Sequence, residues 1–272
     1  MSLQVHAGHS NTGQHGSNQS YDEFISQIQH DIKMAKGDPD KEFSVLDGNI
    51  MKLASKKVGS MFLQDYLKNA DQQLINKIID QVDGKLADLM VGKYGNFFCS
   101  KLIEYLQPHQ RIHFLKQISG KKFVEISCDE KGTWALQNIL HAAMKDEEYR
   151  IIEETIMRDD NISRLSKDKQ GHHMINLIIT SYPEAIREQI FNYICANFKE
   201  LAQDQNGLCV MKKIIEYARN DVLKQRRIVE NIIIDSLEYV QHEFGNFVVQ
   251  EIINLYDFEM CQGIYDQMVG HF

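Results

Sequence analysis

The sequence has little proline, a single tryptophan and no apolar run long enough to cross a membrane. Only three of its 272 residues are proline. Because proline interrupts helices, its scarcity leaves most of the chain free to be helical. Since a long apolar run and a secretory signal are both missing, we expect neither a membrane-spanning nor a secreted protein.

Paired cysteines are missing as well. Five cysteines are present, but no two of them form a CxxC pair, and this pattern is typical of reduced thiols in a cytoplasmic protein. His6, His9 and His15 lie in a polar N-terminal segment that offers no cysteine or carboxylate partner. We therefore expect no bound metal.

The sequence also lacks the signatures of catalysis. It contains no phosphate-binding loop, no nucleophile elbow and no HExxH motif. The adjacent His172 and His173 have no cysteine or serine nucleophile at helical reach beside them. We expect neither enzymatic activity nor a cofactor.

Positive charge is scarce relative to negative charge. Thirty lysines and arginines stand against 38 aspartates and glutamates, which gives a formal net charge of −8. Nucleic-acid-binding proteins usually carry a basic surface, so any such binding here must depend less on a strong positive field.

What the sequence does have is an internal period. Segments of one pattern begin at six glycines that are 36, 37, 39, 36 and 38 residues apart, namely Gly59, Gly95, Gly132, Gly171, Gly207 and Gly245. Periods of this length are typical of helical repeat proteins, in which each unit buries its apolar face against its neighbours.

Each glycine opens a predicted amphipathic helix. The third, fourth, seventh and eighth residues after it are all apolar, which is the spacing of one helical stripe. A further apolar residue lies six positions before each glycine. We expect the stripe to form the core. Its members are Phe62, Leu63, Tyr66, Leu67, Phe98, Cys99, Leu102, Ile103, Ala135, Leu136, Ile139, Leu140, Met174, Ile175, Ile178, Ile179, Val210, Met211, Ile214, Ile215, Val248, Val249, Ile252 and Ile253.

The opposite face of these helices has a different chemistry. The first, second and fifth residues after each glycine lie within about one turn of one another. The middle residue is mostly flat or polarizable, and its two neighbours are mostly amides or hydroxyls. Such side chains can stack on a nucleobase and hydrogen-bond to its edge. The triplets are Ser60, Met61 and Gln64; Asn96, Phe97 and Ser100; Thr133, Trp134 and Gln137; His172, His173 and Asn176; Leu208, Cys209 and Lys212; and Asn246, Phe247 and Gln250.

These segments resemble the repeats of the Pumilio (PUF) RNA-binding family, and GNFVVQEII at residue 245 is nearly a consensus repeat core. The resemblance implies an all-α fold, a right-handed α–α superhelix or solenoid of three-helix repeats that forms a crescent. It implies that the second helices line the concave surface and bind single-stranded RNA, about one base per repeat. It also implies a cytoplasmic post-transcriptional regulator that binds 3′ untranslated regions of mRNA and controls translation or stability.

The resemblance assigns roles within each triplet. The first and fifth residues are expected to read the base edge: Ser60, Gln64, Asn96, Ser100, Thr133, Gln137, His172, Asn176, Lys212, Asn246 and Gln250. The middle residues are expected to stack: Met61, Phe97, Trp134, His173, Cys209 and Phe247. Repeat six matches the family's uracil-reading set in full. Repeats one and three resemble adenine readers, and repeat two resembles a uracil reader with serine in place of glutamine. Repeats four and five depart from the pattern at both edge positions.

The expected domain organisation follows from the period. We predict a disordered tail over 1–19, a capping helix and linker over 20–46 that begins with a capping box at Ser20 and Glu23, and a repeat array over 47–272. The six units match the family's first six of the usual eight, so the array is expected to be incomplete at its C-terminus. An uncapped last repeat predicts self-association.

Two functions remain open. The first is the sequence-biased RNA binder that the resemblance implies. The alternative is a protein-binding helical-repeat scaffold with reduced RNA specificity, which the acidic charge and the irregular repeats favour. Regulatory protein partners on the convex face are compatible with either function.

Overall fold

The computed structural model describes residues 13–271 of the chain, and within this range it contains helices and no strand. The described residues fall into two compact units, the first ending at Asp83 and the second beginning at Gly84. The all-α fold class predicted from the period is confirmed. None of the described helices has the length and apolar character needed to cross a bilayer.

The first unit holds two leading helices and repeat one. The leading helices are α1 (Gly13–Ala35) and α2 (Pro39–Leu46), and repeat one consists of α3 (Ile50–Ala54), α4 (Lys57–Leu67) and α5 (Gln72–Val82). Within this unit α1 contacts repeat one through Tyr21, whose hydroxyl donates to the Lys52 carbonyl at 3.4 Å. The Lys52 Nζ lies 3.6 Å from the centre of the Phe24 ring.

The start of α1 differs from the prediction. The helix begins at Gly13 rather than Ser20, so Ser20 and Glu23 lie inside it and do not form its N-cap. Once a helix is nucleated by packing, adding residues costs little, which allows poor helix formers to extend it. Residues 1–12 of the predicted tail, with His6 and His9, lie outside the described residues, as does the side chain of His15.

The predicted linker contains a helix. In α2, the Asp38 side chain accepts a hydrogen bond from the Lys41 N–H and Pro39 occupies the first helical position. Both are ordinary helix-start signals that the sequence displays. The prediction of a linker here is therefore wrong for residues 39–46, which are helical.

The second unit holds repeats two to six, each of three helices. Repeat two is α6 (Leu86–Val91), α7 (Gly95–Ile103) and α8 (Pro108–Ile118); repeat three is α9 (Lys121–Cys128), α10 (Gly132–Ala142) and α11 (Asp146–Ile156); repeat four is α12 (Asn161–Lys167), α13 (His172–Ser181) and α14 (Glu184–Ala196); repeat five is α15 (Phe198–Ala202), α16 (Gly207–Ala218) and α17 (Val222–Ile233); repeat six is α18 (Ser236–Gln241), α19 (Gly245–Leu255) and α20 (Phe258–Met268).

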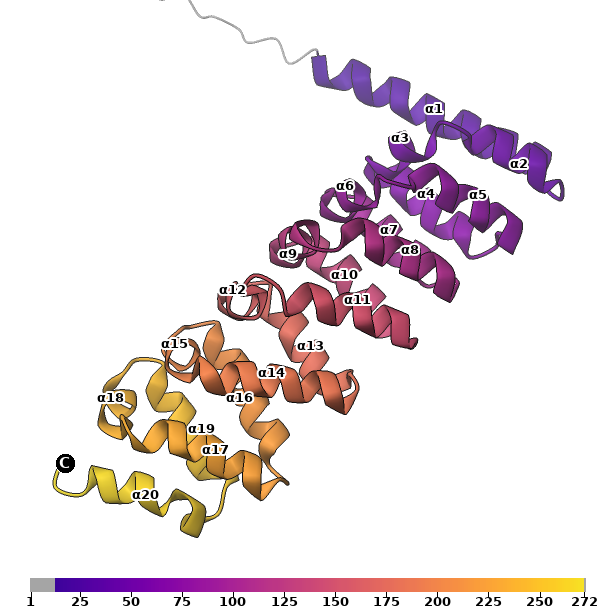
Figure 1. Cartoon of the computed structure of the whole chain (residues 1–272). Helices are drawn as coiled ribbons and strands as arrows, with labels where there is room; N and C mark the ends of the chain where they lie inside the picture. The colour runs from indigo at the N-terminus through magenta and orange to yellow at the C-terminus, as the bar shows by residue number, and fades with distance from the viewer. Residues whose placement is uncertain (1–12, 272) are drawn as a thin grey trace, which may run out of the picture. The chain divides into compact units, whose positions relative to one another are not determined.

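Equivalent helices of these five repeats stack in series. The second helices α7, α10, α13, α16 and α19 each contact the next one in the order of the chain. The first helices α6, α9, α12 and α15 also contact one another in order, and α14, α17 and α20 do so among the third helices. The repeats therefore form successive helical layers of a solenoid (Figure 1).

The predicted apolar stripe forms the core of both units. All of its members are buried except Phe62, Tyr66 and Ile253, which are half-buried. Full burial of a large apolar side chain contributes about 1.5–3 kcal/mol, so this stripe supplies much of the stability of each layer.

The six glycines allow the first and second helices of each repeat to touch. In every repeat, a Cβ on the glycine would lie 2.3–2.9 Å from the carbonyl oxygen of the residue six positions earlier, which belongs to the first helix. Real Cβ atoms do not approach oxygen so closely. The glycines therefore recur with the period of this backbone contact. Glycine is needed there because a side chain would not fit, and not because the backbone adopts a positive φ.

In repeats three to six, the loop before the second helix is held by a side chain three residues before the glycine. In repeats three, four and five this side chain is Asp129, Asp168 or Asp204, whose carboxylate accepts hydrogen bonds from two loop N–H groups, including that of the glycine. In repeat six, His242 Nδ1 accepts the equivalent two bonds. These bonds fix the chain as it enters the helix that carries the candidate site.

One buried ion pair links the third helices of repeats two and three. Glu148 has a fully buried side chain, and its Oε1 lies 2.6 Å from Arg111 Nε. The other oxygen of Glu148 accepts hydrogen bonds from the N–H groups of Met144 and Lys145 at the start of α11. Because removing one partner would leave a buried charge unpaired, this pair fixes how the two helices meet.

We predict that replacing a repeat glycine by alanine lowers the stability of the protein more where the glycine lies closer to the carbonyl oxygen. Gly207→Ala places a Cβ 2.3 Å from the Leu201 carbonyl oxygen, whereas in Gly132→Ala the nearest atoms are 2.9 Å away. Alanine is normally favoured over glycine in a helix by about 1 kcal/mol. Overpacking costs about 1–3 kcal/mol, so we expect Gly207→Ala to be less stable than the parent. We expect a smaller loss of stability in Gly132→Ala, because its added Cβ is less crowded. Thermal unfolding measures both; equal stability of Gly207→Ala and the parent would contradict the steric explanation.

Candidate nucleic-acid interface

The structure places the six predicted stacking residues on the exposed face of the second helices. Trp134 is 64% exposed, Phe97 56%, Met61 54% and Phe247 44%. His173 and Cys209 are exposed as well. Large flat side chains that turn away from an otherwise apolar core are available to stack on a ligand.

The predicted edge residues are less accessible than the stacking residues. At the first position Ser60, Asn96, Thr133 and His172 are buried, and Asn246 is half-buried. At the fifth position Gln64, Ser100, Gln137 and Asn176 are half-buried, whereas Lys212 and Gln250 are exposed. Most of the side chain at the first position is therefore inaccessible in repeats one to four.

In three repeats the two edge residues bond to each other. The amide nitrogen of Gln64 donates to Ser60 Oγ at 3.2 Å, that of Gln137 to Thr133 Oγ1 at 3.2 Å, and that of Gln250 to Asn246 Oδ1 at 3.0 Å. Gln137 and Gln250 keep a carbonyl oxygen and one N–H for a ligand, whereas the Gln64 amide also donates to the Ser60 carbonyl and keeps its oxygen. The amide is thus oriented before any ligand arrives.

The two asparagines at the first position share one geometry. The Asn96 amide donates to the carbonyls of Gly92 and Lys93, at 2.8 and 3.1 Å. The Asn246 amide donates to the carbonyls of His242 and Glu243, at 2.7 and 3.1 Å. Both N–H bonds are used within the protein, so the side-chain oxygen is the group that each asparagine offers to its neighbours.

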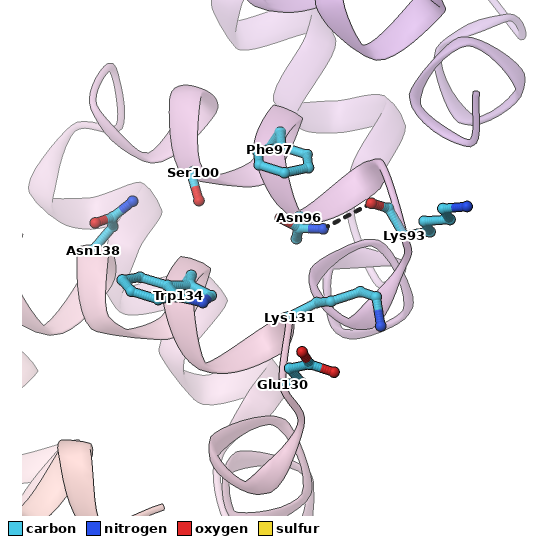
Figure 2. A pocket seen from close by; sticks show the side chains of 8 residues that line it. All are labelled: Lys93, Asn96, Phe97, Ser100, Glu130, Lys131, Trp134 and Asn138. Carbon is cyan, nitrogen blue, oxygen red and sulfur yellow. Dashed lines mark hydrogen bonds between the residues drawn. The ribbon is translucent and has the colours of Figure 1, made fainter. Parts of the chain in front are cut away.

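A groove of about 460 Å³ lies between the second helices of repeats two and three. Its lining residues are Lys93, Asn96, Phe97, Ser100, Glu130, Lys131, Trp134 and Asn138. Figure 2 shows the Phe97 and Trp134 rings, from α7 and α10, on two sides of this groove, with Ser100 and Asn138 toward one end and Lys93, Lys131 and Glu130 toward the other. The structure thus brings together the predicted Asn96, Phe97, Ser100 and Trp134.

Repeat four presents two imidazole rings. The His172 and His173 ring centres are 4.0 Å apart, and His172 Nδ1 lies 3.2 Å from the Asp168 carbonyl oxygen. Burial lowers the pKa of His173 below its usual value, and the neighbouring His172 lowers it further. His173 is therefore a neutral flat ring at pH 7, suited to stacking rather than to binding phosphate.

In repeat five, the side chain of Lys212 extends toward repeat six. Lys212 Nζ lies 3.8 Å from Glu251 Oε2 and 6.0 Å from the centre of the Phe247 ring. Leu208 is half-buried and offers no hydrogen bond. Repeat five consequently has no pair of edge groups.

Most lysines on the second helices, or just after them, form ion pairs with a nearby carboxylate. Lys101 pairs with Glu104, Lys213 pairs with Glu216, and in the first unit Lys68 pairs with Asp65. Lys93 and Lys131 also line the groove, although neither is among the site residues predicted from the sequence. Their signal was available, because both lie within two residues before a repeat glycine.

Comparison with known proteins identifies the family. The model of the Pumilio-family RNA-binding repeat matches residues 85–119, 122–156, 161–195, 197–233 and 237–269, which together make up more than half of the chain. The chain belongs to the Pumilio family. Repeat one lies outside the matched residues, although it has the same three helices and the same glycine contact.

Relatives agree with this assignment. The chain is 30% identical over 212 residues to a Pumilio domain-containing protein of Schizosaccharomyces pombe, covering 78% of this chain and 30% of the relative. It is 28% identical over 255 residues to Pumilio homolog 12 of Arabidopsis thaliana, covering 91% of this chain and 42% of the relative. The chain thus spans less than half the length of these two relatives.

Solved structures share the fold. The Puf4 RNA-binding domain bound to a recognition sequence from the HO endonuclease RNA 3′ UTR is 27% identical, with a TM-score of 0.73, and the match covers 82% of this chain and 68% of that domain. PUF-8 in complex with PBE-RNA has a TM-score of 0.76 at 16% identity, covering 96% and 81%. This second likeness bears on the fold alone.

Proposed function

We propose that this Pumilio-family chain binds single-stranded RNA along its second helices, about one base per repeat, and regulates mRNA after transcription. The observation that carries this proposal is the groove with Phe97 and Trp134 on two sides, contributed by successive repeats. The Puf4 domain bound to a 3′ UTR sequence supports a target of this class.

Stacking is the main source of binding energy in this proposal. A base that enters the groove contacts the Phe97 and Trp134 rings, and each stacked base contributes about 1–3 kcal/mol. In this proposal the edge of such a base faces Asn96 Oδ1 and the Ser100 hydroxyl, which also line the groove. Because stacking does not need a large positive field, it is compatible with the net charge of −8.

The hydrogen bonds of repeat six support the proposed preference for uracil. Gln250 retains a carbonyl oxygen and one N–H after bonding to Asn246. This acceptor and donor complement the N3–H and a carbonyl oxygen of uracil. We propose adenine for repeats one and three, a relaxed uracil preference for repeat two, and weak selectivity for repeats four and five.

We predict that removing the stacking rings weakens RNA binding without unfolding the protein. Trp134→Ala and Phe247→Ala should each cost about 1–3 kcal/mol, or roughly 5- to 150-fold in Kd, for a short RNA of uracil and adenine. Fluorescence anisotropy measures the Kd, and circular dichroism checks the fold. Leu223→Ala removes a comparably exposed apolar side chain from the third helix α17 and serves as the control.

A protein that shows no RNA binding at low salt, or binding that both alanine variants leave unchanged, would refute this proposal. The first result would favour the scaffold alternative. That alternative is also supported by the exposed Val222 and Leu223 on the third helix α17, which are 59% and 76% accessible. Protein partners on the convex face, a cytoplasmic location and the absence of enzymatic activity stay predictions.

Repeat six allows a test of base reading. We predict that Asn246→Ser combined with Gln250→Glu shifts the preferred base at its RNA position from uracil to guanine, because glutamate accepts two hydrogen bonds and donates none. A panel of four RNAs that differ at this one position measures the preference. An unchanged order of affinities would mean that repeat six reads no base edge.

Self-association through the last repeat also stays a prediction. Phe258 in α20 and Val269 just after it are 66% and 77% exposed and would be covered in such a contact. Sedimentation velocity over a range of concentrations should reveal dimers that Phe258→Ser weakens. A monomer at every concentration would contradict this prediction.

A further inference from the structure

Three lysines lie in equivalent loops of repeats two, three and four. Lys93, Lys131 and Lys169 each come one or two residues before the repeat glycine, in the loop that leads into α7, α10 or α13. Lys93 and Lys131 line the groove between Phe97 and Trp134, at the end away from Ser100 and Asn138 (Figure 2). We call these three residues the loop lysines.

Within the second unit, the loop lysines differ in their pairing from the lysines that lie on the second helices themselves. Lys101, Lys212 and Lys213 each form an ion pair with a glutamate. In the part of the chain that the structure describes, none of the loop lysines forms an ion pair. Their charge is therefore available to a ligand, whereas the other charges are already partly neutralised.

The acidic groups near the loop lysines leave a positive balance. The Asp129 and Asp168 carboxylates accept hydrogen bonds from loop N–H groups, which partly offsets their charge. Glu130 also lines the groove and opposes one of the two lysines there. Among the residues that line this end of the groove, two lysines and one glutamate leave a formal charge of +1, in a protein whose total charge is −8.

The loop lysines have no counterpart in the last two repeats. The two residues before the glycine are Gln205 and Asn206 in repeat five, and Glu243 and Phe244 in repeat six. Repeat six nevertheless has the most regular stacking and edge residues. Cationic loops and regular base readers thus occur in different repeats of the same array.

We propose that the loop lysines bind the phosphates of the RNA backbone as it passes repeats two to four. This inference rests on the proposed function. A base that stacks between Phe97 and Trp134 with its edge toward Ser100 has its sugar and phosphate toward Lys93 and Lys131. Repeats two to four then hold the strand through charge and stacking, and repeat six selects its base without a phosphate contact.

This arrangement has a measurable consequence for salt dependence. Each phosphate neutralised on single-stranded nucleic acid contributes about −0.7 to the slope of log K against log salt concentration. Three loop lysines should account for a slope of about −2. A phosphate contact carries no sequence information, so its loss weakens binding to all sequences alike.

The test compares two triple variants with the same change in net charge. Lys93→Gln, Lys131→Gln and Lys169→Gln remove the loop lysines. Lys116→Gln, Lys121→Gln and Lys199→Gln form the control, because these lysines are exposed on first and third helices. Anisotropy titrations of both variants and the parent at several salt concentrations give the slopes, and circular dichroism checks that all three proteins are folded.

We expect the loop variant to lose about 2 from the magnitude of the slope and at least about tenfold in affinity at low salt, with its base preferences unchanged. The control should retain the slope of the parent. Replacing phosphates opposite repeats two to four with neutral methylphosphonates should weaken the parent but not the loop variant.

An equal loss in both triple variants, or an unchanged slope in the loop variant, would overturn the inference and leave the proposed function intact. A parent that binds no RNA, or binds it independently of Trp134, would instead refute the proposed function and the inference with it.

Discussion

The contact between a glycine and a backbone carbonyl in each repeat is the constraint on which the rest of the structure depends. The first and second helices approach so closely that a Cβ would lie within 2.9 Å of the carbonyl oxygen. This approach sets the rotation of the second helix about its axis. One face of that helix is then buried as the apolar stripe, and the other face must be exposed.

The loop before the second helix serves both the fold and the candidate site. Asp129, Asp168 and Asp204 hold its N–H groups and position the first turn, where the edge and stacking residues lie. In repeats three and four the same loop carries a lysine that forms no ion pair in the described structure. Binding groups on this loop lose little conformational entropy when a ligand binds, because the loop backbone is already ordered.

The acidic composition and an RNA ligand are compatible because local charge differs from total charge. The lysines on the second helices of the second unit are paired with glutamates, whereas the loop lysines form no ion pair in the described structure. Stacking contributes energy that does not depend on the total charge. The array thus combines regular base readers, irregular repeats and local cationic loops.

The sequence by itself determined the repeat, the core stripe and the stacking face, because a backbone contact that only glycine permits recurs at a fixed period and helical geometry assigns each following residue to a face. It did not reveal that Ser60 and Thr133 are almost fully buried, that Gln250 is held by Asn246, or that Lys212 turns toward Glu251. The predictions made from the sequence also omitted α2 and set the start of α1 at Ser20 instead of Gly13. Burial and side-chain pairing depend on neighbouring repeats, so only the tertiary structure decided which edge groups and which lysines are available to a ligand.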